Sequence, residues 1–376
     1  MVQYKIGFPY VGDRFGGSNM SSLIMATALR DRGHDVTVFT HGPGRAHDEA
    51  AARGLKTELL PALSDIGGYE RPDRARPEQL AAFPHCWRSI KRHGLDIIHT
   101  NDMTMLRTWA LPSLASGSKL IAHWRTSSKA SASIAGSLLP AKKIISVSGY
   151  SKAILPGWLQ KKTTVEFNAL ETFWSAEQRA QAKKAVRERL NLPADAALVG
   201  VFGNLTRRKR AHVLADILHA LPEPVAGRPV YGLACGGPVE PLDTEFDLKR
   251  QAYGLMDRLI APGFVRPVYE WMAACDVILA PAEREPLARN ILEAMALGVP
   301  VVASTDGGLV EVLRDGENGF LLAPRETDRW IEIVRRLLND VELAERIAVA
   351  GQRTAETLSV ANHARRIEDI YRAAIS

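Results

Sequence analysis

Cysteine and long apolar runs are both scarce in this chain of 376 residues. The three cysteines, Cys86, Cys235 and Cys275, are far apart and odd in number, which argues against a disulfide framework and is typical of a reducing compartment. No stretch approaches the ~20 apolar residues of a membrane-spanning helix, and a short strand-like segment begins at residue 4. We therefore expect a cytoplasmic protein that is neither exported nor transmembrane.

Motifs for nucleic acids and metals are missing as well. The sequence has no zinc-ligand spacing, no basic heptad region and no aromatic strand of the RNP type, so we expect no nucleic-acid partner. It also has no compact Asp-x-Asp after a strand and no grouping of His with Cys. We predict no metal site and no cofactor.

The charge is divided unevenly along the chain. Residues 1–170 hold 22 Lys and Arg against 13 Asp and Glu, whereas residues 171–376 hold 26 against 29. A basic first half attracts an anionic membrane surface, an acidic acceptor or nucleic acid alike. Charge alone does not choose among these partners. If the partner is a membrane, the protein would lie peripherally on the inner face of the cell membrane.

Composition and length predict a globular protein of two domains. Hydrophobic residues make up 46% and charged residues 24% of the sequence, which allows a sizeable core. A chain of this length exceeds what one core usually supports. We expect a first domain over residues 1–172, a linker helix region over 173–196 and a second domain over 197–355. A C-terminal helix over 356–376 should pack back toward the first domain.

Alternating strand and helix patterns predict an α/β fold in both halves. Residues 35–39, 96–99, 119–123 and 143–148 are short buried strands with helical periodicity between them, and the same rhythm resumes at 197–203 after a polar helix at 176–189. This order is typical of doubly wound parallel sheets, so we expect two Rossmann-like domains with a central cleft. Ligands of such sheets bind beyond the carboxyl ends of the strands.

The stretch over residues 281–311 is the richest of these strand ends. Glu285 and Glu293 are separated by seven residues, and Gly307-Gly308 follows the next predicted strand. A strand that leads through a loop into a helix near Leu287 presents unpaired backbone N–H groups and a partial positive charge. A diphosphate would bind there.

These residues resemble the E-x7-E region of glycosyltransferase family 4, which contains retaining transferases of the GT-B fold. The resemblance extends along nearly the whole chain, through short motifs in matching order: Gly16-Gly17, Ser146-Val147-Ser148, Phe167-Asn168-Ala169, residues 203–209, Gly236-Gly237, Gly263-Phe264-Val265 and Gly307-Gly308. It implies a GT-B architecture with a nucleoside-diphosphate sugar as co-substrate, in which residues 1–172 form the acceptor-binding domain and residues 197–355 the nucleotide-sugar-binding domain.

The resemblance assigns a role to each glutamate of the motif. Glu285 would accept hydrogen bonds from hydroxyls of the donor sugar, and Glu293 would hold the ribose. Taken alone, Glu285 is also compatible with a helix N-cap and Glu293 with a solvent-facing helix position. The backbone of Leu287, Ala288, Arg289 and Asn290 would contact the diphosphate, although relatives commonly carry Gly at the position of Ala288.

Lys209 is the expected phosphate clamp, because an ammonium after this turn offsets the charge that develops on a departing diphosphate. Most family members carry Arg where this chain has Asn204, so one fixed positive charge is missing from the expected pair. Arg207 or Arg208 is placed to compensate. Such a basic run is often a solvated turn, but its place after Gly203 favours a phosphate contact.

Further contacts come from the first domain and from one loop of the second. Gly16 and Gly17 allow close approach of a ligand to the backbone, though a Gly-Gly turn is weak evidence alone. His123 ends a predicted strand where the resemblance places a contact to the donor sugar, and His99 is the competing histidine. Arg266 lies where relatives contact the nucleotide base, and an ordinary surface Arg is the alternative.

Together these features predict a retaining hexosyltransferase that uses a UDP- or GDP-sugar, without metal, in lipopolysaccharide, exopolysaccharide or lipid-linked glycan assembly. Glu285, Lys209 and His123 are the predicted catalytic residues. The acceptor would be a saccharide or a lipid-linked saccharide. Two alternatives stay open: a catalytically idle binder of sugar nucleotides or saccharides, and an epimerase or phosphorylase of the same fold.

Overall fold

The structure is a computed structural model that describes residues 2–12, 15–63, 77–237, 239 and 243–375. Its contacts divide the chain into two units, residues 1–169 with 358–376, and residues 170–357. The C-terminal helix therefore belongs to the first unit, and the segment 173–196, expected as a linker, belongs to the second. Each unit contains one parallel sheet.

The first unit has a seven-stranded sheet in the order β3-β2-β1-β4-β5-β6-β7. Its strands are β1 (Lys5–Val11), β2 (Asp35–His41), β3 (Lys56–Leu60), β4 (Ile97–Thr100), β5 (Lys119–Trp124), β6 (Ala141–Ser146) and β7 (Thr163–Val165). Its helices are α1 (Gly17–Asp31), α2 (Arg45–Ala52), α3 (Pro77–Ala81), α4 (Phe83–His93), α5 (Met103–Ser116), α6 (Ala132–Ser137), α7 (Gly149–Ala153), α8 (Gly157–Gln160) and α16 (Val360–Ile375).

Side chains alternate between the two faces of this sheet, as the pleat requires. Ile98 and Leu120 pack with α4 and α5 on one face, whereas Ile97 and Ile121 pack with α1, α2 and α16 on the other. One predicted strand is displaced: β6 ends at Ser146, two residues earlier than expected. The Ser148 hydroxyl instead accepts a hydrogen bond from the backbone N–H of Ser151 at 3.1 Å and caps α7.

The second unit has a six-stranded sheet in the order β10-β9-β8-β11-β12-β13. Its strands are β8 (Ala197–Phe202), β9 (Val230–Cys235), β10 (Leu259–Gly263), β11 (Val277–Ala280), β12 (Val301–Ser304) and β13 (Phe320–Leu322). Its helices are α9 (Ala176–Arg189), α10 (His212–Ala220), α11 (Thr244–Ala252), α12 (Val268–Ala274), α13 (Arg289–Ala296), α14 (Thr327–Asn339) and α15 (Val341–Glu356), with the 3-10 turns η1 (Arg207–Lys209) and η2 (Gly308–Glu311).

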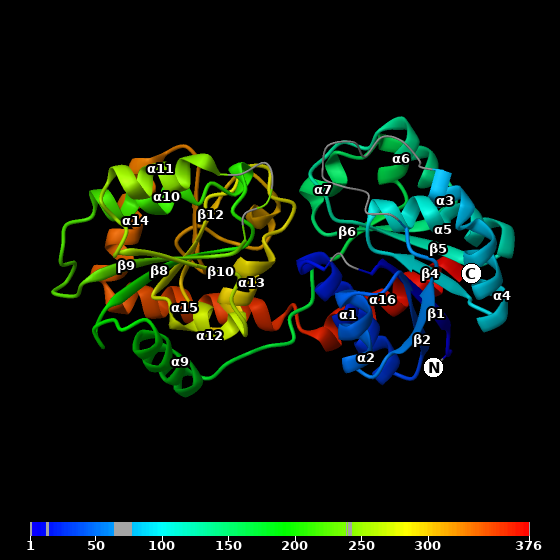
Figure 1. The fold of residues 1–376 in the computed structure, drawn as a ribbon, viewed down its shortest axis with the longest axis horizontal. Helices are drawn as coiled ribbons and strands as arrows, with labels where there is room; N and C mark the ends of the chain where they lie inside the picture. The colour runs from blue at the N-terminus through cyan, green and yellow to red at the C-terminus, as the bar shows by residue number, and fades with distance from the viewer. Residues whose placement is uncertain (1, 13–14, 64–76, 238, 240–242, 376) are drawn as a thin grey trace. The chain divides into compact units, whose positions relative to one another are not determined.

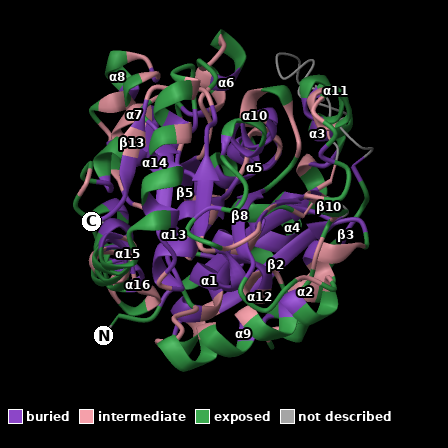
Figure 2. Cartoon of the chain, turned by 90° about the vertical axis from the view of Figure 1, so that its left-hand side faces the viewer, coloured by how far each residue is buried: buried purple, intermediate pink, exposed green. Residues whose placement is uncertain are grey.

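Helices cover both faces of the second sheet (Figure 1). On one face α10, α11 and α14 bury a core that includes Leu214, Phe246 and Trp330. On the other face α9 packs on α12, and α13 packs on α15. Figure 2 shows the same layering in the buried strands and the exposed outer surfaces of the helices. Among the described residues, no helix combines the length and apolar composition needed to cross a bilayer.

Helix α9 is fixed to the second sheet by a buried carboxylate at the start of β11. The Asp276 side chain is 2.7 Å from Lys183 Nζ and 3.1 Å from an Arg187 nitrogen, and it accepts the backbone N–H of Leu198 at 2.9 Å. Burial alone would raise the pKa of Asp276, but the neighbouring cations, led by Lys183, hold the pKa below its ordinary value.

This cluster predicts a pH-dependent effect of Asp276→Asn on stability. A carboxyl with a lowered folded-state pKa contributes stability above the unfolded pKa of about 3.9, and this contribution is lost as the pH falls through the folded-state pKa. We expect the substitution to lower the free energy of unfolding by about 3 kcal/mol at pH 7, because it leaves buried cations unpaired. Urea unfolding at pH 7 and below pH 3 would show a difference that shrinks in acid. A constant difference would contradict this account.

Candidate functional site

The strands β8 and β11 are neighbours at the point where the strand order of the second sheet reverses. β8 pairs with β9 on one side and with β11 on the other. Their carboxyl ends border a pocket lined by Gly203, Asn204, Lys209, Ala282 and Asn290, among others. Crevices at such reversal points are the usual ligand sites of open parallel sheets.

Two glycines allow the loops around this pocket to pack backbone against backbone. Gly307 has a φ of 152°, and a Cβ there would lie 2.0 Å from the carbonyl oxygen of Glu285. The backbone N–H of Gly308 donates to that same oxygen at 2.9 Å. Gly236 has a φ of 156°, and its Cβ would lie 1.8 Å from the carbonyl oxygen of Gly203. The loop after β12 is thereby packed on the loop after β11, and the loop after β9 on the loop after β8.

Glu285 lies at the centre of an ion cluster. Its side-chain Oε2 is 2.7 Å from Lys209 Nζ and 2.8 Å from an Arg208 guanidinium nitrogen. The glutamate is 8% exposed. Arg210 is directed instead to Glu283, 3.5 Å away, while Arg207 is exposed. The basic run therefore is not a uniformly solvated turn, because two of its side chains, Arg208 and Lys209, converge on Glu285.

The charge balance of this cluster is positive. Burial alone would raise the pKa of Glu285, but Lys209 and Arg208 outweigh burial and hold its pKa below the ordinary value. One carboxylate thus faces two cations, and the excess positive charge suits an anionic ligand.

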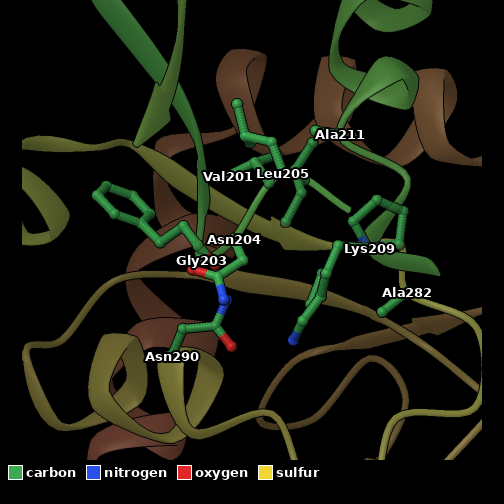
Figure 3. Close-up of a pocket in the computed structure, with 12 residues that line it drawn as sticks. Val201, Gly203, Asn204, Leu205, Lys209, Ala211, Ala282 and Asn290 are labelled. Atoms are coloured by element: carbon green, nitrogen blue, oxygen red, sulfur yellow. The ribbon is translucent and has the colours of Figure 1, made fainter. Parts of the chain in front are cut away.

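The turn into α13 supplies the backbone side of the same site. Leu287 and Ala288 are buried, and Ala288 is extended, so the helix begins at Arg289, two residues later than expected. No side chain caps this N-terminus. The Asn290 amide donates to the carbonyl oxygen of Phe202 at 2.8 Å, which ties the first turn of α13 to the end of β8. Figure 3 shows Asn204 and Asn290 on one side of the pocket and Lys209 entering from the other.

Glu293 is neither solvent-facing nor unpartnered. Its Oε1 accepts a hydrogen bond from Arg289 Nε at 2.5 Å and lies 3.5 Å from the Tyr269 hydroxyl. Arg289, predicted to contact the donor through its backbone, has its side chain occupied by this ion pair. Burial disfavours the Arg289 cation, but Glu293 outweighs burial and raises its pKa.

Arg266 lies in the loop after β10. Its guanidinium carbon is 5.2 Å from the centroid of the Phe264 ring, and Phe264 is 65% exposed. Arg266 is also exposed, and both residues follow a strand whose neighbour is β9.

In the first unit, Gly16 and Gly17 open α1. The N–H of Gly16 donates to Asn19 Oδ1 at 3.3 Å, and a Cβ at Gly16 would have no neighbour within 4 Å. The space in front of this turn is therefore open in the first unit. The Asn101 amide, at the end of β4, donates to the carbonyl oxygen of Ser18 at 3.0 Å, so the start of α1 is joined to the strand ends.

His123 belongs to the same network of strand ends. Its Nδ1 is 3.2 Å from an Arg125 nitrogen and 3.3 Å from His99 Nε2. Arg125 also donates to Asn101 Oδ1 at 2.7 Å and to Asn168. The two histidines that competed in the sequence are therefore in contact with each other.

The structure thus groups the predicted site residues into three sets, and their roles stay predictions. Glu285, Lys209, Arg208 and Asn290 converge at β8 and β11, with Asn204 on the pocket wall. Glu293 pairs with Arg289. Gly16, Gly17 and His123 share a network in the first unit.

Sequence reasoning missed two members of that network, Asn101 and Tyr371, and it included Asn168 only as part of a matching motif. Asn101 directly follows β4, and the rule that ligands lie beyond the carboxyl ends of strands could have found it.

Among the residues that the structure describes, no three His, Cys, Asp or Glu side chains group as metal ligands.

Two families match the chain, one on each half. The family described as Glycosyltransferase Family 4 matches residues 15–165, and the family described as Glycosyl transferases group 1 matches residues 182–354. The two matches leave only short segments uncovered at the ends and at the crossover between the units.

Individual relatives extend along most of the chain. A D-inositol 3-phosphate glycosyltransferase of Xylanimonas cellulosilytica is 29% identical over 92% of this chain and 88% of its own. The lipopolysaccharide core biosynthesis mannosyltransferase LpsB of Rhizobium meliloti is 29% identical over 61% and 64%. The structure of Anabaena HepE in complex with UDP-glucose matches with a TM-score of 0.82 at 22% identity, over 98% of this chain and 100% of HepE. At that identity the structural match shows the fold alone.

The close packing at Gly307 predicts a large cost for Gly307→Ala. The substitution adds a Cβ in a backbone conformation restricted to glycine and in conflict with the Glu285 carbonyl. We expect it to lower the free energy of unfolding by about 2 kcal/mol more than Gly316→Ala. Gly316 is the matched control, because its φ is 71° but a Cβ there has no neighbour within 4 Å. Equal losses in denaturant titrations would show that the Gly307 contact is not tight.

Proposed function

Because the chain belongs to the glycosyltransferases of group 1 and family 4, we propose that it transfers a hexosyl group from a UDP- or GDP-sugar to an acceptor hydroxyl with retention of the anomeric configuration. Glycosyl transfer follows from the family, and the GT-B fold class expected from the sequence is confirmed. The donor and the stereochemistry are the proposal. The observation that carries it is the buried cluster of Glu285, Lys209 and Arg208 at the strand reversal.

The cluster suits a leaving nucleoside diphosphate. Negative charge grows on the diphosphate as the bond from the anomeric carbon to its oxygen breaks, and fixed cations lower the energy of that state. Lys209 and Arg208 are already oriented by Glu285, so they need little rearrangement to receive an anion. Arg208 supplies the second positive charge that the family has at the position of Asn204.

Glu285 is better suited to orient the donor sugar than to act as a base or nucleophile. Its Oε2 is shared by two cations, and a carboxylate so held is a weak base and a weak nucleophile. We therefore assign it to the hydroxyls of the donor sugar. The acceptor proton would pass to an oxygen of the departing diphosphate on the same face of the sugar, which retains the anomeric configuration without a protein base.

The remaining predicted residues are assigned to the rest of the donor. Glu293, fixed by Arg289, would accept hydrogen bonds from the ribose, and the backbone beside Arg266 would contact the base. The Nε2 of His123 would hydrogen-bond to the sugar. With Lys209, Arg208 and the first N–H groups of α13 available for the phosphates, we propose catalysis without a metal ion.

The substitution Lys209→Ala tests this assignment. Loss of one preorganised charge at a developing anion typically costs about 10²- to 10³-fold in turnover, so we expect a decrease of that size in kcat. Transfer and donor hydrolysis would be measured with a panel of UDP-, GDP- and ADP-sugars by release of the nucleoside diphosphate. NMR of the products would establish the anomeric configuration.

Lys184→Ala is the matched control for this experiment. It makes the same change in the same unit at an exposed position on α9, where the side chain is 79% exposed and 3.9 Å from Glu188. We expect it to keep the activity of the unaltered chain. Near-normal turnover of Lys209→Ala would overturn the phosphate role. Absence of transfer and hydrolysis with every donor would favour the idle binder, and an epimerised sugar or a sugar phosphate would favour the other alternative.

For the acceptor, we propose a saccharide or lipid-linked saccharide of the cell envelope, with the protein on the inner face of the membrane. The support is the excess of Lys and Arg in residues 1–170 and the likeness to a lipopolysaccharide core mannosyltransferase. Attraction of this kind weakens with salt. We therefore expect cosedimentation with anionic vesicles at low ionic strength that declines toward 0.5 M salt, and little with neutral vesicles. Equal recovery with both vesicle types would contradict a role for charge.

A further inference from the structure

His123 has one ring nitrogen that is crowded and one that is not. Its Nδ1 faces both Arg125 and His99. Its Nε2 is buried and has no hydrogen-bond partner among the described residues, and the residue is 5% exposed. A buried polar atom without a hydrogen-bond partner lowers the stability of the fold. Whether Nε2 is a donor or an acceptor therefore indicates which kind of ligand atom would bind it.

The neighbours of Nδ1 fix the tautomer of His123. An Arg guanidinium can only donate hydrogen bonds, so the Arg125 nitrogen at 3.2 Å requires an acceptor at Nδ1. The proton of a neutral His123 ring must then be on Nε2. Burial, followed by the charge of Arg125, lowers the pKa of His123 well below its ordinary value, which keeps the ring neutral. The unpartnered atom is therefore a hydrogen-bond donor.

His99 connects His123 to the C-terminal helix α16. His99 Nε2 is 3.3 Å from the acceptor Nδ1 of His123, so the favourable tautomer of His99 carries its proton on Nε2. His99 Nδ1 is then an acceptor, and the Tyr371 hydroxyl, 2.6 Å away, donates to it. Burial lowers the pKa of His99 as well, and the Phe8 ring stacks on it with centroids 5.1 Å apart.

We propose that Tyr371 and His99 are positioning residues, which orient His123 from the C-terminal helix so that its Nε2–H is presented to an oxygen of the bound nucleotide sugar. The proposal rests on the proposed function only for the identity of that oxygen. The direction of the chain, from the Tyr371 hydroxyl through His99 to His123, follows from the first unit alone. Helix α16 would therefore orient His123 in addition to stabilising the core of the first unit.

The direction of the chain can be read by NMR without any ligand. In the protein labelled with ¹⁵N-histidine, we expect His123 and His99 both to show a protonated Nε2 and an unprotonated Nδ1 at neutral pH. In Tyr371→Phe, the His99 Nδ1 resonance should move, because it loses its hydrogen-bond donor. A proton on Nδ1 of His123 would overturn the proposal, and this measurement on the unaltered chain stands even if the variant fails to fold.

Tyr10→Phe is the matched control. Tyr10 is also fully buried in the core of the first unit, but its hydroxyl donates to Ser22 Oγ at 2.7 Å and not to a histidine. Both variants delete one buried hydroxyl, so both should lower the melting temperature to a similar extent. Only Tyr371→Phe should shift the histidine resonances. Equal shifts in both variants would assign Tyr371 a purely structural role.

Activity provides the second measurement. Loss of one hydrogen bond in the chain should lower kcat/KM for the preferred nucleotide sugar by about 3- to 10-fold in Tyr371→Phe, with little change in Tyr10→Phe. Unchanged kcat/KM in Tyr371→Phe, together with a shifted His99 resonance, would show that the chain does not serve the ligand and would overturn the proposal. If the unaltered chain used no nucleotide sugar, the proposed function would fail, whereas the NMR result on the chain's direction would be unaffected.

Discussion

The carboxylate of Glu285 is buried at the carboxyl end of the second sheet. Its ion pairs with Lys209 and Arg208 offset the cost of burying its charge. An unpaired buried carboxylate would cost several kcal/mol, so the pairing fixes where the two cations lie before any ligand arrives. The loops that hold the glutamate are themselves fixed by close backbone contact at Gly307. Packing and charge in this part of the chain are therefore consequences of one arrangement, in which two cations surround one anion and leave a net positive charge.

The first unit also buries polar groups at its strand ends, but these groups are neutral. Its strand ends carry His99, His123 and Asn101, and burial keeps both rings uncharged while an Arg125 nitrogen lies 3.2 Å from His123 Nδ1. A network of neutral donors and acceptors has a defined direction, because each group can donate or accept only at certain atoms. Under the proposed function, such a network would position hydroxyl groups of a ligand, whereas the cluster around Glu285 would attract phosphates.

Sequence reasoning found the parts of the fold that depend on local pattern. The helix at 176–189 has the expected bounds, and the strand predicted over 197–203 begins at the expected residue and ends one residue earlier, since periodicity and capping are local. It also found that Glu285, Lys209 and Asn290 lie beyond the ends of predicted strands. It could not foresee that Arg289 would be occupied by Glu293, because both residues were considered separately as ligand contacts. The sequence gives no indication of a role for Tyr371, because an aromatic residue on the apolar face of a helix is typical of a core position. Its contact with His99 follows only from the packing of α16 on the first sheet.

The most direct test of the account is a crystal structure of the chain with UDP or GDP bound. The account predicts that the diphosphate lies beyond β8 and β11, within hydrogen-bond distance of Lys209 Nζ, Arg208 and the first backbone N–H groups of α13, with the ribose beside Glu293. A diphosphate bound elsewhere, with the contacts of Glu285 to Lys209 and Arg208 unchanged, would contradict it.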